Sequence, residues 1–363
     1  MHRSPSSQQG LTLIELMIAL TLGLIAIGAL VAVFMSSNLN YRQNEALATV
    51  QDNARFALDA LSRDLAMAGY WGGIRPLDAA INLKVSAAAR SAVAKASAAG
   101  DCGPASQGAN DYWLFDVRTP VVFRNNTLGS SSIASDFTCL STSIFQPNSD
   151  VLVIRRVSGQ AIFSIDANGT RTPATAETTP NRFYVRTNQS TGTLYRAGTT
   201  FTLSGPTDCP DSSGVSSICT PTTNPVQVYA YTPQIYYVRN YARNAGDGVP
   251  MLCRYYLDDT LATPKMVEDC LAEGVENLQI EWGISTDGSG VVNNYLTNPQ
   301  PDDLQRAITA RIHILVRAPS RNTTASGDAK TFKLGDAPDQ TSSDGVLRRV
   351  FTTTVQLKNF QPS

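Results

Sequence analysis

A carboxylate near the start of an apolar segment is the first feature of this sequence that could do chemistry. Glu15 comes just before the twenty residues from Leu16 to Met35, which include no charge. An unpaired charge in such a segment costs about 2.5–3.5 kcal/mol at the centre of a bilayer, so Glu15 is expected to have a partner. A cut after Gly10 would give Leu11 a new α-amino group four residues before Glu15, on the same helical face. This amine, from the same chain or from a neighbouring subunit, is the predicted partner.

The apolar run itself is long enough to cross a bilayer as a helix, because ~20 residues at ~1.5 Å each match a hydrocarbon core ~30 Å thick. Two other interpretations stay open: a secretory signal cut near residues 26–28, and an uncleaved membrane anchor. An ordinary secretory signal has an apolar core of only about 7–15 residues. Neither alternative explains Glu15.

The residues Gly10-Leu11-Thr12-Leu13-Ile14-Glu15-Leu16 resemble the start of type IV prepilins and of their secretion relatives, the pseudopilins. The resemblance implies that a membrane-embedded aspartic peptidase cuts after Gly10 and methylates Leu11. Leu11 replaces the usual Phe, a difference that bears on methylation more than on cleavage. The leader, residues 1–10, has Arg3 and no acid, as expected for an end retained in the cytoplasm.

The six cysteines all follow the membrane segment, which predicts up to three disulfides in an oxidising compartment such as the periplasm. Sequence alone allows fifteen complete pairings. Pairing of neighbours closes the shortest loops and is our prediction: Cys102 with Cys139, Cys209 with Cys219, and Cys253 with Cys270. A metal site is disfavoured, because no C-x-x-C pair occurs and His313 is the only histidine outside the leader.

No other constellation indicates catalysis, a cofactor or a metal. His313 alternates with Arg311 and Arg317, so we expect a solvated surface histidine. Gly288-Ser289-Gly290 lacks the frame of a nucleophile elbow, and neither 287–294 nor Asp302-Asp303 follows a known Ca²⁺-loop spacing. With 29 basic against 30 acidic residues, the chain has no nucleic-acid footprint. A protein that is not an enzyme is therefore predicted, with an anchored periplasmic enzyme as the disfavoured alternative.

The element that must position Glu15 is a long helix. Beyond Ser36 apolar residues recur at intervals of three and four, which predicts one continuous helix from Leu11 to Ala68; they are Leu47, Val50, Ala54, Leu58, Leu61 and Leu65. Gly69 can end this helix in the left-handed conformation, and Pro76 prevents an early restart.

The rest of the chain is predicted to be rich in strands, with a short helix or loop over 86–99. Three strands alternate apolar and polar residues, at 277–284, 307–316 and 351–357. Six more are expected at 112–117, 151–157, 183–186, 226–231, 235–238 and 252–257. Loops are expected at 125–135, 166–181, 204–225 and 319–345. The fold class is therefore α+β, with the long helix packed on an antiparallel sheet.

Two further runs resemble the PilW branch of minor pilins: residues 53–70, and residues 274–278 with 348–359. We accordingly expect a leader at 1–10, a transmembrane helix at 11–35, an amphipathic helix at 36–68, and a periplasmic β-rich domain at 69–363. The resemblance implies a pilin-like fold anchored in the bacterial inner membrane and, after processing, incorporated into a surface pilus.

The implied function is that of a minor pilin that primes or joins type IV pilus assembly near the tip, with roles in twitching motility and cell adhesion. Its implied partners are other minor pilins, the major pilin, the prepilin peptidase, the inner-membrane assembly platform with its motor ATPase, and a tip adhesin. Two alternatives remain: a minor pseudopilin of type II secretion, and a membrane-anchored binding module that never polymerises.

Overall fold

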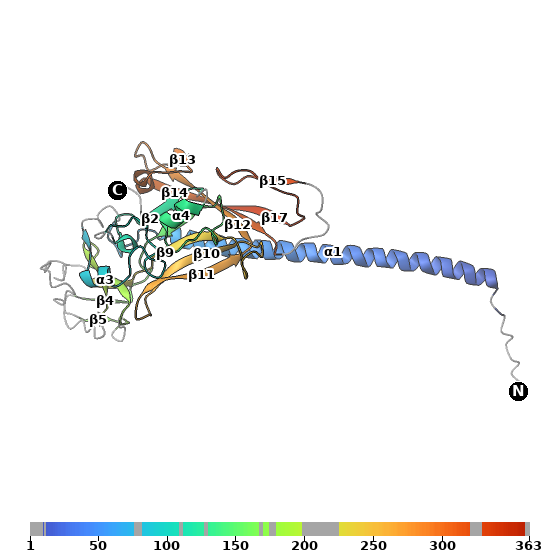
Figure 1. The fold of residues 1–363 in the computed structure, drawn as a ribbon, viewed down its shortest axis with the longest axis horizontal. Coiled ribbons are helices and arrows are strands. Elements are labelled where there is room, and N and C mark those ends of the chain that lie inside the picture. The colour runs from blue at the N-terminus through green and yellow to red at the C-terminus, as the bar shows by residue number, and fades with distance from the viewer. Residues whose placement is uncertain are drawn as a thin grey trace, which may run out of the picture.

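A single helix carries the N-terminus far from a β-rich body (Figure 1). The computed structural model describes residue 10 and residues 12–75, 82–108, 112–126, 130–166, 170–173, 179–197, 225–319 and 329–359. Helix α1 (Leu13–Ala66) runs without interruption for 54 residues, about 80 Å at 1.5 Å each. Gly69, with φ of 72°, then adopts the left-handed conformation expected of a residue that ends a helix. The predicted helix is thus present; Leu11 and Pro76 lie outside the described residues.

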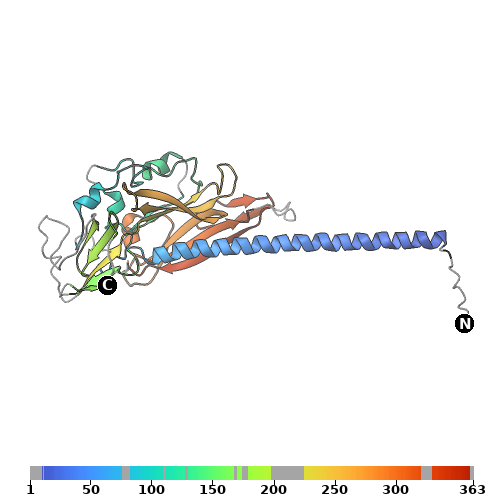
Figure 2. The same ribbon diagram turned by 90° about the horizontal axis from the view of Figure 1, so that it is seen from below.

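The C-terminal half of α1 is held by one apolar stripe. Its fully buried members are spaced three and four residues apart and therefore share a helical face: Val50, Ala54, Ala57, Leu61 and Leu65. Small residues at two of these positions let the helix backbone approach the sheets closely. Figure 2 shows the sheets gathered around this half of α1, while the N-terminal half extends free of the body.

Two antiparallel sheets enclose the main core together with α1. One has five strands, in the order β11 (Lys265–Glu273), β10 (Met251–Asp258), β9 (Gln234–Arg239), β3 (Val151–Ile154) and β2 (Val121–Arg124). The other has four, in the order β13 (Asn294–Leu296), β12 (Val275–Ile284), β14 (Ala307–Arg317) and β17 (Arg348–Gln356). Apolar residues of β12 and β14 face this core at every second position, because side chains alternate between the faces of a strand.

A third sheet, called the distal sheet below, lies at the end of the body farthest from the N-terminus (Figure 1). Its strands are β1 (Leu83–Val85), β7 (Gly192–Arg196), β6 (Phe183–Thr187), β8 (Val226–Ala230), β4 (Phe163–Ile165) and β5 (Arg171–Thr172), in that order. A second core joins this sheet to the outer face of the five-stranded one. The remaining described elements are short: α3 (Ala87–Ser91), η1 (Trp113–Phe115), α4 (Ser130–Asp136), α5 (Pro301–Gln305) and the hairpin of β15 (Lys330–Phe332) and β16 (Gln340–Ser342).

The strand predicted at 112–117 is wrong: the chain there forms the 3₁₀ turn η1. Leu114 and Phe115 are buried as a strand would bury them, but Asp116 accepts hydrogen bonds from Arg118 and Thr119 and bends the chain. Strand β11 was not predicted, because its alternation is broken by acidic residues that pair across the sheet. Three stretches predicted as loops include short elements: 125–135 includes most of α4, 166–181 includes β5, and 319–345 includes the β15–β16 hairpin. The loop predicted at 204–225 lies outside the described residues except for its last residue.

Candidate assembly interface

The exposed part of α1 is the largest apolar surface that the described residues present. From Leu13 to Met35 the large apolar side chains are between half and three-quarters exposed. The most apolar 18-residue window of this helix has a mean hydropathy of 2.7, and none of it is buried by the body. Length and composition suit a helix that crosses a bilayer, and the same surface would suit packing against other helices.

Glu15 belongs to the cap of this helix. The backbone N–H of Glu15 donates to Thr12 Oγ1 at 3.3 Å, and the backbone N–H of Thr12 donates to Glu15 Oε2 at 3.4 Å. This reciprocal pair is a capping box, which satisfies two of the N–H groups that every helix leaves unpaired at its start. The carboxylate also lies at the positive end of the helix dipole.

The predicted partner of Glu15 lies outside the described residues, since that part of the chain includes Gly10 but not Leu11. The structure therefore gives Glu15 a local partner, Thr12, that the sequence analysis missed. The signal was present as Thr12-Leu13-Ile14-Glu15, the spacing of a capping box. The cap and an incoming amine are compatible, because a carboxylate accepts several hydrogen bonds through its two oxygens.

One buried charge ties α1 to the body. Asp64, near the end of the helix, accepts hydrogen bonds from Arg156 Nε at 3.1 Å and from the hydroxyl of Tyr236 on β9. The Asp64 and Arg156 side chains are only 8% and 16% exposed. Burial and the neighbouring Asp64 carboxylate raise the pKa of Tyr236, so its hydroxyl stays protonated as a donor. The pairing fixes the rotation and axial position of α1 against the five-stranded sheet.

Two predicted disulfide pairs are present in the structure, Cys102–Cys139 and Cys253–Cys270. The second joins neighbouring strands β10 and β11. Glu268 lies close to these two sulfurs, but sulfurs bonded to each other are not the thiolates that a metal requires. Cys209 and Cys219 lie outside the described residues.

His313 is less exposed than we expected. Its side chain is 16% exposed, with Nδ1 at 2.9 Å from Thr352 Oγ1 and Nε2 at 3.2 Å from Glu281 Oε2. The expectation of a solvated histidine is wrong because β12 and β17 flank β14 and supply these two partners. His313 thus connects three strands of the four-stranded sheet.

The other sequence candidates take structural positions. Asp287 and Ser289 form the turn between β12 and β13, where hydrogen bonds from Ser289 lower the pKa of Asp287 to about 2. Asp303 caps the start of α5 by accepting from the backbone N–H of Gln300 at 3.0 Å. Most residues of this turn are exposed.

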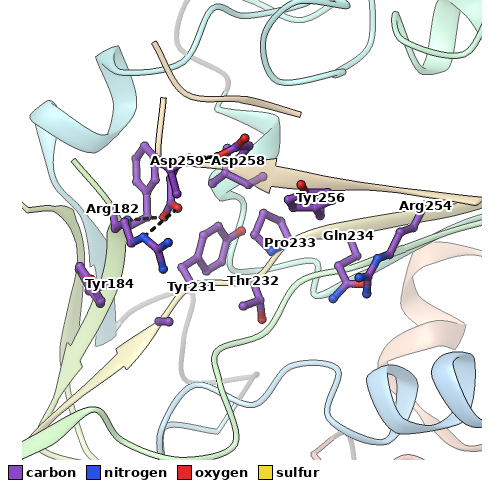
Figure 3. Close-up of a pocket in the computed structure, with 14 residues that line it drawn as sticks. Arg182, Tyr184, Tyr231, Thr232, Pro233, Gln234, Arg254, Tyr256, Asp258 and Asp259 are labelled. Carbon is purple, nitrogen blue, oxygen red and sulfur yellow. Dashed lines mark hydrogen bonds and ion pairs between the residues drawn. The ribbon is translucent and has the colours of Figure 1, made fainter. Parts of the chain in front are cut away.

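A pocket of about 400 Å³ lies between the distal sheet and the five-stranded sheet (Figure 3). Its charged side chains are already paired within the chain. Asp259 accepts from the backbone N–H of Phe183 at 3.0 Å and lies 3.6 Å from Arg182, and Arg254 pairs with Asp269 at 2.9 Å. Burial raises the pKa of Asp259, whereas hydrogen bonds from Thr260 lower that of Asp258. The contacts of Asp259 tie the two sheets together beside the pocket, whereas the Arg254–Asp269 pair lies within the five-stranded sheet.

Comparison with known proteins identifies both ends of the chain. A family model described as Type IV Pilus-assembly protein W matches residues 235–359, a region that begins in β9 and ends just after β17. A second, described as the Prokaryotic N-terminal methylation motif, matches residues 5–31. Searches of the curated proteins and of the solved structures gave no match.

The two matches fall on the parts of the structure that define its architecture. The methylation motif covers the start of α1 with Gly10 and Glu15, and the other match covers the long strands β12, β14 and β17 of the four-stranded sheet that packs on α1. Residues 32–234, which include all six strands of the distal sheet, are matched by neither. The chain thus combines a prepilin-type N-terminal motif with a C-terminal region that matches the PilW family model, and together these support a PilW-like pilin related to the type IV pilus.

Proposed function

We propose that this protein is a minor pilin that is cleaved after Gly10 and then primes or joins pilus assembly near the tip. The observation that carries the proposal is the exposed N-terminal half of α1 with a carboxylate on its first turn. Such a helix is equally stable in lipid and beside other apolar helices, so extraction from the membrane into a fibre costs little hydrophobic free energy.

Glu15 sets the axial position at which a subunit docks in the fibre. In the bilayer its carboxylate is held by the capping box. In an assembly, the new N-terminal amine of a neighbouring subunit would neutralise it, and a subunit out of register would leave a charge buried without a partner. Gly10 and Leu11 are thus proposed as the processing site and Glu15 as the assembly residue. Other pilus subunits, the prepilin peptidase and the assembly platform are the proposed partners.

The test uses three variants of the full chain. Glu15→Ala and Glu15→Gln are expected to stay in the membrane and be cleaved, but to be strongly depleted from sheared pili, because neither carries the charge. Thr12→Val is the matched control, since it removes the capping hydroxyl and keeps the carboxylate. Mass spectrometry of the N-terminus and immunoblots of membrane and pilus fractions report the outcome. Normal incorporation of both Glu15 variants would exclude the mechanism.

A deletion strain separates the pilus from a secretion system. The proposal predicts loss of piliation or twitching with type II secretion intact, and the reverse would make the protein a pseudopilin. A mature chain that begins at Met1 would instead indicate an anchored binding module that does not polymerise. A chain that begins at Leu11 is the expected result.

A further inference from the structure

Strand β17 is the long strand of the body whose outer edge remains open. Open edges present rows of unpaired N–H and C=O groups, and proteins normally shorten, distort or cover them. In the described part of the chain the other sheet edges are treated in these ways. Strands β1, β2, β5 and β13 have only two to four residues, and at β11 the side chain of Asn53 on α1 donates from Nδ2 to Glu273 O at 2.8 Å.

The edge of β12 that faces away from β14 is also paired. Where β12 extends beyond its short partner β13, the loop before β3 takes over the pairing. The backbone N–H of Asp150 donates to Leu278 O at 2.9 Å, and the backbone N–H of Ile280 donates to Asp150 Oδ2 at 2.8 Å. The opposite edge of the same sheet, β17, has nine residues without proline or lysine. It pairs with β14 in nine consecutive registers without a bulge.

The register identifies which backbone groups face outward. Beyond the two ends of β17, Ala318 N–H donates to Leu347 O, and Leu357 N–H donates to Ile308 O, both at 2.8 Å. Residues that bond to one neighbouring strand alternate along an antiparallel strand. Odd-numbered residues of β17 therefore bond to β14. The backbone groups that face the open edge belong to the even-numbered residues: Arg348, Val350, Thr352, Thr354 and Gln356.

These outward groups are accessible. Thr352, Thr354 and Gln356 are exposed, and no residue in the described ranges pairs with the outward backbone groups of β17. Helix α1 contacts β17 and shares a core with Val355 on one face of the sheet. None of the hydrogen bonds among the described residues joins α1 to the outward backbone groups of β17.

Charge decides what kind of strand fits. Residues 348–358 include no acid, and the exposed cations Arg349 and Lys358 flank the Thr-rich centre. A second copy of β17 would bring the same cations and no carboxylate to this edge. A strand with a β-branched centre and acidic residues at its ends would complete the hydrogen-bond ladder and pair both cations.

We propose that β17 binds such an extended, acid-flanked segment of another pilus subunit by strand addition. This inference rests on the proposed function, because the partner is a neighbouring subunit. Strand addition would give the subunit a second intermolecular contact, on the body, in addition to the contact made by the apolar helix. The contact is specific in register, since a one-residue slip would turn the partner's side chains to the wrong face.

The probe is a fluorescent peptide of alternating Val and Thr with two Glu at each end; its counterpart has Lys at each end. Fluorescence anisotropy with the detergent-solubilised full chain measures binding. Thr354→Pro removes one outward N–H and none from the β14 ladder, a position where edge strands tolerate proline. Thr354→Val keeps the N–H and the branched shape.

We expect the wild type and Thr354→Val to bind the acidic peptide alike, and Thr354→Pro to bind it at least about tenfold more weakly. The Lys-flanked peptide should bind at least about tenfold more weakly to the wild type. Equal binding by Thr354→Pro, or no binding by the wild type, would overturn the proposal. If proline lowers the melting temperature, Arg349→Glu repeats the test without it. Reversing this flanking charge should weaken binding of the acidic peptide, and Arg349→Lys is the control that keeps the charge.

A photo-crosslinking residue at position 354 tests the partner in cells. A crosslink to an acid-flanked extended segment of another pilus subunit is expected, and it should disappear when proline replaces Thr352. Crosslinking only to a second copy of this chain would overturn the choice of occupant. An uncleaved N-terminus would refute the proposed function while leaving the peptide result unchanged, so the two proposals fail separately.

Discussion

At the scale of single residues, two carboxylates of α1 have opposite environments. Glu15 is exposed at the first turn and is paired, among the described residues, with Thr12. Asp64 is buried at the last turn and paired with Arg156 and Tyr236. The first is available to another subunit, whereas the second is committed to its own body. The N-terminal end of α1 can therefore contact another subunit, whereas its C-terminal end is held by contacts within the chain.

Removing the charge of Asp64 is expected to destabilise the body strongly. Asp64→Asn leaves Arg156 buried without its counter-ion, and loss of one member of a buried pair costs about 3–5 kcal/mol. Asp59→Asn is the control on the same helix, because its pair with Arg63 is exposed on both sides, and such pairs contribute less than about 1 kcal/mol. Chemical denaturation of the detergent-solubilised chain, followed by circular dichroism, compares the two. Similar losses for both variants would contradict this assignment of Asp64.

A second residue prediction concerns pH. Hydrogen bonds from Arg348 hold the pKa of Asp344 below its ordinary value of 3.8. A carboxyl whose folded pKa is depressed stabilises the fold above its unfolded pKa, and this contribution is lost as the pH falls through the folded value. Asp344→Ala should therefore lower the melting temperature at pH 7, and the gap to the wild type should close below pH 3.8.

Asp52→Ala provides the baseline for this pH series, because Asp52 is exposed on α1 and makes no ion pair within the described residues. Its melting temperature should follow the wild type at every pH. A constant gap between Asp344→Ala and the wild type down to pH 2 would show that the effect is not electrostatic.

At the scale of elements, α1 is one helix with two surfaces. Its first half is apolar all round and exposed, whereas its second half is apolar on a single stripe that the sheets bury. The β-strands were predictable where one face is buried, because alternation then appears in the sequence. The predictions 277–284 and 307–316 fall within β12 and β14, and 351–357 extends one residue beyond the end of β17. The segment 112–117 shows where this kind of prediction fails. A turn that buries apolar residues has the same apolar and aromatic composition as a buried strand, so composition alone does not distinguish the two.

Enlarging a side chain in the buried stripe of α1 is expected to lower the free energy of unfolding. Ala57→Leu adds three carbons where the helix meets the sheets and Ala57 is fully buried. Overpacking of this kind costs about 1–3 kcal/mol. Ala48→Leu, on the exposed face, makes the same chemical change and should alter the free energy of unfolding by less than about 0.5 kcal/mol. Equal effects at the two positions would mean that α1 does not dock as described.

At the scale of the whole molecule, the body is a sandwich closed by α1, with the distal sheet added beyond it. The C-terminal match covers the sandwich strands from β9 onward, and all six strands of the distal sheet belong to the unmatched residues. The two disulfides follow the same division. Cys253–Cys270 joins strands of the sandwich sheet, and Cys102–Cys139 joins loops of the second core.

Loss of the loop disulfide should cost more than loss of the strand disulfide. The sequence separations are 37 and 17 residues, and the longer closed loop restrains the unfolded chain more, by about 0.7 kcal/mol. Strands β10 and β11 are also held by their own hydrogen-bond ladder. The double variants Cys102→Ala/Cys139→Ala and Cys253→Ala/Cys270→Ala are compared by denaturant unfolding. A greater loss for the second pair would contradict this ranking.

The sequence by itself determined the membrane-length helix, the processing motif around Gly10 and Glu15, and the alternating strands that pack on α1. These features are local, because hydrophobic spacing and a short motif are readable within one segment. Only the tertiary structure decided that Asp64 is anchored by Arg156 and Tyr236, that His313 is enclosed by its neighbouring strands, and that β17 keeps an open edge. Each of these depends on which distant segments pair. Loop closure and strand order set this pairing of distant segments, and the hydrophobic periodicity within one segment does not encode it.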